Sequence, residues 1–126
     1  MDTKNTTADS EGVALAEDMG YCLGRAFVLV WGAEKHDNPV ESLELARDCI
    51  HREIDRRKGF ILRGETPDAY VPDTMVNRFR RIIEAESGSK GQALTLIFSS
   101  HQMPVAIRTL SAAIIHINDY ILEVQP

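Results

Sequence analysis

An apolar pattern near the carboxyl end of the chain constrains the fold more than any other feature of the sequence. Residues 105–124 read VAIRTLSAAIIHINDYILEV, and apolar residues recur there at alternating steps of three and four. This spacing is typical of one face of an α-helix, which consists here of Ile107, Leu110, Ile114, Ile117, Ile121 and Val124. Because Ile115 and Leu122 widen this face, it needs partners on more than one side. The helix is therefore expected to be either the centre of a bundle or half of a homodimer interface.

Three earlier segments also show helical periodicity, and turn residues separate them. We expect helices over residues 11–34, 39–58 and 73–86. In the second, Asn38 and Glu41 have the spacing of an N-terminal capping box, and Gly59 is the expected end. We expect the third helix to bury Val76, Phe79 and Ile83. The turn SGSKG at residues 87–91 should stop it.

The first expected helix contains a ridge of small residues. Gly12, Ala16, Gly20 and Gly24 follow one another at every fourth position. Each interior glycine costs about 1 kcal/mol relative to alanine, so this helix needs a closely approaching neighbour to offset the cost. Residues 26–31 also suit a strand, because they are rich in aromatic and β-branched side chains.

Pro104 should kink or break the helical pattern of the last third of the chain, because proline removes a helix hydrogen bond. Ser99 or Ser100 would then cap the helix that follows. No alternation of apolar and polar residues lasts long enough to predict a sheet. The predicted fold class is therefore all-α: a four- to five-helix bundle with antiparallel neighbours and a long apolar C-terminal helix.

Size and composition are those of a globular domain. The chain has 126 residues, of which 44% are hydrophobic and 26% are charged. We expect a disordered tail over residues 1–9 and a single helical domain over residues 10–126. The first residues carry acids where a secretory signal carries basic charge, and no apolar run reaches the ~20 residues that cross a bilayer. We therefore predict a cytoplasmic location, with no membrane contact. Cys22 and Cys49 lack zinc or redox spacing and are expected to be buried thiols.

The segment ARDCIHREIDRRKG, residues 46–59, is rich in ionisable side chains. Glu44, Asp48 and His51 share an acidic stripe on the expected second helix. Asp48 and His51 have the i, i+3 spacing found in helical di-metal carboxylate proteins, which makes these three residues candidate metal ligands. The stripe lies opposite the apolar side of the helix, so a solvated face is the alternative interpretation. On that interpretation we expect no cofactor.

Residues 47–81 are basic within an acidic chain. They carry nine basic and six acidic side chains, whereas the whole chain has a net charge of −5. If the second and third helices lie side by side, their arginines could bind phosphate or an acidic partner: Arg52, Arg56, Arg78 and Arg81. Neighbouring acids could instead pair with them. The overall acidity disfavours nucleic-acid binding.

No catalytic residue is assigned, because the sequence contains no phosphate-binding loop, zinc motif or dinucleotide fingerprint. The broad apolar face of the last helix favours a protein that acts by binding another protein, as a regulator, adaptor, chaperone-like protein or inhibitor, and that forms a homodimer. One alternative is a small helical enzyme or sensor with a metal or polar pocket at Glu44, Asp48 and His51. Another is a phosphate or nucleic-acid binder that uses the arginines.

Overall fold

The computed structural model describes residues 12–125, and every regular element in that range is helical. The helices are a segment over residues 12–17, α2 (Tyr21–Trp31), the short 3-10 helix η1 (Ala33–Lys35), α3 (Pro39–Arg63), α4 (Asp73–Ile83), α5 (Gly88–Gln102) and α6 (Arg108–Val124). The predicted all-α class is confirmed. Residues 26–31 lie within α2, so the strand alternative is wrong. The expected tail over residues 1–9 lies outside the described residues.

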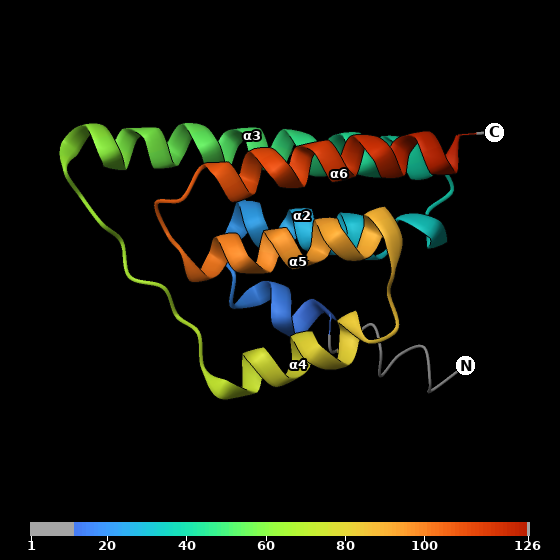
Figure 1. Cartoon of the computed structure of the whole chain (residues 1–126), viewed down its shortest axis with the longest axis horizontal. Coiled ribbons are helices and arrows are strands. Elements are labelled where there is room, and N and C mark those ends of the chain that lie inside the picture. The colour runs from blue at the N-terminus through green and yellow to red at the C-terminus, as the bar shows by residue number, and fades with distance from the viewer. Residues whose placement is uncertain (1–11, 126) are drawn as a thin grey trace.

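The helices are arranged in layers (Figure 1). α2 and α5 form the middle layer, with α3 and α6 on one side of it and α4 and the segment 12–17 on the other. α2 packs on α3 and α5, and α6 packs on α5 and α3. α5 and α6 run antiparallel, as do α2 and α3. α3 and α4 therefore lie on opposite sides of the middle layer, and a long connection over residues 64–72 leads from one to the other.

Aromatic contacts hold α4 on the middle layer. The ring of Phe79 stacks on Phe98 of α5 with centroids 4.3 Å apart, and it meets Phe27 of α2 edge-on at 6.5 Å. The residues one turn away from Phe79 on the same face, Met75 and Ile82, are therefore buried with it. Val76 and Ile83, which were expected to be buried, are half-buried at the edges of that face.

Within residues 12–125, no helix combines the length and apolarity that crossing a membrane requires.

The first helix differs from the prediction, because the chain turns back at Gly20. Its φ of 83° is a left-handed conformation that favours glycine and ends the helical segment before it. A methyl group at Gly24 would collide with the carbonyl oxygen of Ala16, and one at Gly12 would collide with the ring of Trp31. The small residues therefore permit the close approach that the sequence predicted, but the neighbouring helix belongs to the same hairpin.

α3 begins as predicted and ends later than predicted. The backbone N–H of Glu41 donates to Asn38 Oδ1 at 3.1 Å, which caps the first turn. The helix continues through Gly59 and ends at Gly64, whose φ is 69°. The N–H of Glu65 donates to the carbonyl of Phe60 at 2.9 Å, which completes a Schellman motif at this end.

α5 is longer than the apolar run within it. It begins at Gly88, inside the segment that was predicted as a turn, and it includes both Ser99 and Ser100. The prediction that one of these serines caps the next helix is wrong, because the Ser100 hydroxyl donates to the carbonyl of Leu96 at 2.8 Å within α5. The break around Pro104 is confirmed, since residues 103–107 separate α5 from α6.

Candidate functional site

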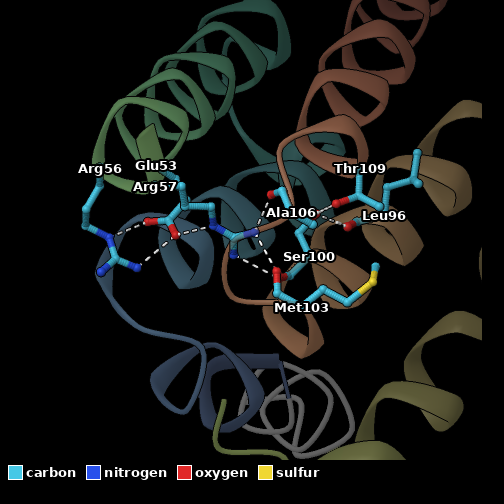
Figure 2. Close-up of polar contacts among 8 residues, drawn as sticks. All are labelled: Glu53, Arg56, Arg57, Leu96, Ser100, Met103, Ala106 and Thr109. Carbon is cyan, nitrogen blue, oxygen red and sulfur yellow. Dashed lines mark hydrogen bonds and ion pairs between the residues drawn. The ribbon is translucent and has the colours of Figure 1, made fainter. Parts of the chain in front are cut away.

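Glu53 and Arg57 form an ion pair in the protein interior (Figure 2). Their side chains are 3% and 2% exposed. Arg57 Nε donates to Glu53 Oε2 at 2.8 Å, and Arg56 donates to both oxygens of the same carboxylate, also at 2.8 Å. Residues three and four positions apart are neighbours on a helix, so a single turn of α3 supplies all three side chains.

The far side of the Arg57 guanidinium caps α5. Nη2 donates to the carbonyl of Ser100 at 2.7 Å, and Nη1 donates to the carbonyls of Met103 at 2.9 Å and Ala106 at 2.6 Å. Carbonyls at the carboxyl end of a helix lack partners within the helix and carry partial negative charge. Arg57 therefore joins the middle of α3 to the turn between α5 and α6.

The environment of Glu53 keeps its carboxylate ionised. Burial by itself raises the pKa of Glu53, but the hydrogen bonds and charges of Arg56 and Arg57 outweigh that effect and hold the pKa below its ordinary value. A group that accepts from two guanidinium ions and has a low pKa is a poor general base at neutral pH. The role of the ion pair is therefore structural. The two arginines that neutralise the Glu53 carboxylate make its burial tolerable.

A cavity of about 260 Å³, here called the polar pocket, opens beside this ion pair. It is lined by the turn before α2, by Glu53, Arg56 and Arg57, by residues 67–70, and by the end of α5. His101 Nε2 lies 2.6 Å from the carbonyl oxygen of Tyr70, so this nitrogen carries the proton and donates. That hydrogen bond ties the long connection to α5 and closes one wall of the pocket.

A second, more open cavity of about 550 Å³ lies between the segment 12–17 and α2, and we call it the hairpin groove. Ala16, Gly20 and Gly24 form its small-residue part, and Glu17 stands on one helix and Arg25 on the other. Its remaining lining is apolar or aromatic: Val13, Tyr21, Val28 and Leu29. Tyr21 is 70% exposed, and its hydroxyl accepts a hydrogen bond from Arg25 Nη1 at 3.1 Å.

The candidate metal ligands Glu44, Asp48 and His51 are all exposed on the outer face of α3. Arg47 approaches Glu44 at 3.8 Å, a surface ion pair of the kind that contributes little to stability. Within residues 12–125 no group of three or more His, Cys, Asp or Glu side chains is placed to hold a metal ion. The geometry is that of a solvated helix face.

The structure separates the four candidate arginines into two places. Arg52 and Arg56 lie on α3, whereas Arg78 and Arg81 lie on α4 beyond the middle layer (Figure 1). The side-by-side packing of α3 and α4 on which a shared basic patch depended is therefore absent from the described residues. Arg56 is already paired with Glu53.

The apolar seam of α6 is used within the chain. Leu110, Ile117 and Ile121 are buried, and the other members, Ile107, Ile114 and Val124, are half-buried against the same core. This removes the main argument for a dimer through the seam. Ile115 and Leu122 remain on the outside of α6, 60% and 69% exposed.

The two cysteines have different surroundings. Cys49 is buried as predicted, and burial raises the pKa of its thiol, which therefore stays protonated at neutral pH. Cys22 is only half-buried, so the prediction that both thiols are buried is wrong for this residue. Both are free thiols.

Glu53 and Arg57 were not among the site residues predicted from the sequence. On a helical wheel Arg57 falls between Ala46 and Ile50, and Glu53 falls between Cys49 and Ala46. Both are therefore on the apolar side of α3, and that position is the signal that could have found them. The carbonyls that accept from Arg57, in α5 and in the turn after it, are at least 43 positions away in the chain, and no local pattern indicates them. Comparison with protein-family models, with curated proteins and with solved structures gives no match.

Proposed function

We propose that this protein acts by binding protein chains through the hairpin groove, and that the chain bound there is a second copy of itself. The observation that carries the proposal is the groove of about 550 Å³, whose lining is mostly apolar although it faces solvent. Grooves of this kind commonly accept the apolar face of a helix. The exposed ring of Tyr21 offers an aromatic anchor for such a contact.

The charges of the groove favour a second copy as the occupant. Glu17 stands on the segment 12–17 and Arg25 on α2, so the two sides of the groove have opposite charge. A two-fold axis along the groove places each side against the other side of the partner copy, which brings Glu17 of one chain to Arg25 of the other. Such complementarity selects this arrangement over pairings that oppose like charges.

We further propose that the helices form one bundle in which antiparallel neighbours bury their apolar faces. The hairpin groove then lies on the outer surface of the bundle. A cytoplasmic location and a regulatory or adaptor role stay predictions from the sequence. We expect weak association, since interfaces below about 1,200 Å² are typical of transient contacts.

Charge reversal tests the proposal. Glu17→Arg and Arg25→Glu should each be monomeric in sedimentation equilibrium, because each opposes like charges at both contacts of the dimer. An equimolar mixture of the two variants should form dimers again, because every contact in the mixed dimer joins unlike charges. Glu44→Arg, a reversal on the exposed face of α3, is the matched control and should dimerise like the wild type.

Two results would contradict the proposal. One is a mixture that stays monomeric while the wild type dimerises, which would show that these charges do not face each other. The other is dimerisation of both single variants that is lost in Ile115→Asp, which would place the interface on the outside of α6.

A further inference from the structure

Arg56 offers an unused end of its guanidinium group at the polar pocket. Nε and Nη2 bind the Glu53 carboxylate at 2.8 Å, and the guanidinium carbon lies 5.0 Å from the centre of the Phe60 ring. The group is therefore held from two sides. Nη1 has no hydrogen-bond partner among residues 12–125, and Figure 2 shows this end pointing away from Glu53. A guanidinium fixed in this way is suited to bind a carboxylate.

Two carboxylates also line the polar pocket. Asp18 is half-buried and Asp68 is exposed, and neither side chain forms a hydrogen bond or an ion pair with another described residue. Because Arg57 offsets the charge of Glu53, the pocket keeps the positive charge of Arg56 and the negative charges of these two acids. An ammonium group would be attracted to the acids, whereas a phosphate dianion would be repelled by them.

The remaining lining of the polar pocket includes apolar side chains. Met19 and Leu23 are 4% and 3% exposed, and Pro67 and Pro104 also line it. Its volume of about 260 Å³ is below the roughly 300–1,000 Å³ of pockets for drug-sized ligands, so the ligand should be small.

We infer that the polar pocket binds a free α-amino acid with an apolar side chain. The carboxylate of the ligand pairs with Arg56, its ammonium group pairs with Asp18 and Asp68, and its side chain lies against Met19 and Leu23. The polar pocket and the hairpin groove share Gly20 in their linings, but the inference does not rest on the proposed association of two chains. Binding in the polar pocket makes the protein a sensor or carrier of a small zwitterion as well as a protein-binding module.

Titration calorimetry of the full chain with four probes tests the inference: L-leucine, N-acetyl-L-leucine, L-leucinamide and orthophosphate. L-leucine should bind, and each blocked form should bind at least about tenfold more weakly because it lacks one of the two charges. The acetylated probe resembles the last residue of a peptide and the amide resembles the first, so these arms distinguish a free amino acid from a peptide end. Orthophosphate should not bind.

Variants locate the binding in the polar pocket. Arg56→Gln and Asp68→Asn should each weaken L-leucine binding at least about tenfold, whereas Arg52→Gln, on α3 but outside the pocket, should bind like the wild type. Asp68 is exposed, so its variant tests the pocket even if Arg56→Gln folds poorly. The inference is wrong if the wild type fails to bind L-leucine at about 10 mM, if a blocked form or phosphate binds as tightly, or if Asp68→Asn leaves binding unchanged.

Discussion

α3 carries two groups of ionisable residues that the fold treats in opposite ways. Glu53 and Arg57 are buried and hydrogen-bonded, whereas Glu44, Asp48 and His51 face solvent on the other side of the same helix. Within each group, consecutive residues are three or four positions apart. The two groups differ in what packs against them. The buried group meets backbone carbonyls from the end of α5 and the turn after it, whereas the exposed group meets solvent. The comparison shows that helical spacing determines which charged residues share a face of the helix. Tertiary packing then determines which of those faces is buried and structural.

Among the variants that test this comparison, removal of Arg57 should cause the largest loss of unfolding free energy. Arg57→Met leaves Glu53 buried with one guanidinium fewer and removes a side-chain donor from the carbonyls of Ser100, Met103 and Ala106. Breaking a buried pair in this way costs about 3–5 kcal/mol of unfolding free energy. Urea unfolding measures it, with Arg52→Met on the exposed face as the control. A loss below about 1 kcal/mol would mean that the pair is not structural.

Neutralisation of Glu53 should cause a smaller loss of unfolding free energy than removal of Arg57, and it should change how that free energy depends on pH. Because the pKa of Glu53 in the folded protein lies below its ordinary value of 4.5, its contribution is present above that value and is lost as the pH falls through the folded pKa. Glu53→Gln should cost about 1.5–3 kcal/mol at pH 7, where hydrogen bonds to a charged group are lost.

The same variant provides the pH test. Unfolding free energies measured from pH 7 to pH 3 should fall more steeply for the wild type than for Glu53→Gln, so that the two curves converge at low pH. Parallel curves would show that the Glu53 carboxylate does not gain from its arginine partners.

Ser100→Ala should have an intermediate effect on the buried side. The Ser100 hydroxyl donates to the carbonyl of Leu96 and lies 2.7 Å from the hydroxyl of Thr109, while its own carbonyl accepts from Arg57. The variant removes only the hydroxyl contacts, so we expect a loss of about 1 kcal/mol in urea unfolding. A loss as large as that of Arg57→Met would mean that the serine, and not the arginine, organises this end of α5.

Changes on the exposed stripe should have the smallest effect. The double variant Asp48→Asn, His51→Ala should shift the unfolding free energy by no more than about 0.5 kcal/mol, because both side chains are solvated. Thermal unfolding with Mn²⁺, Mg²⁺ or Zn²⁺ should be the same for wild type and variant. A stabilisation by metal that disappears in the variant would restore the metal-site alternative.

Much of the fold could be predicted, and the errors have physical causes. The cap at Asn38 follows from local hydrogen bonding, so its prediction is confirmed. Gly59 and Gly64 are both possible helix ends, and the choice of Gly64 depends on contacts beyond the predicted end: Arg56 and Arg63 lie over the Phe60 ring. The turn at Gly20 depends on packing between two helices, which periodicity does not report.

The polar pocket and the hairpin groove could be predicted less well than the fold. Asp18, Arg56 and Asp68 belong to three separate parts of the chain, and the packing of α2 on α3 together with the long connection brings them to one cavity. The ridge of small residues did indicate a close approach between helices. The sequence could not indicate that the hairpin thus formed would leave Tyr21 exposed beside it.

The association of two chains through the hairpin groove is tested most directly by the mass of the wild-type protein in solution. Sedimentation velocity over a concentration series up to about 100 µM covers the affinities expected of a small interface. The mass should rise from that of one chain toward that of two, and Tyr21→Asp should keep it at one. A single-chain mass for the wild type at every concentration would contradict the proposal.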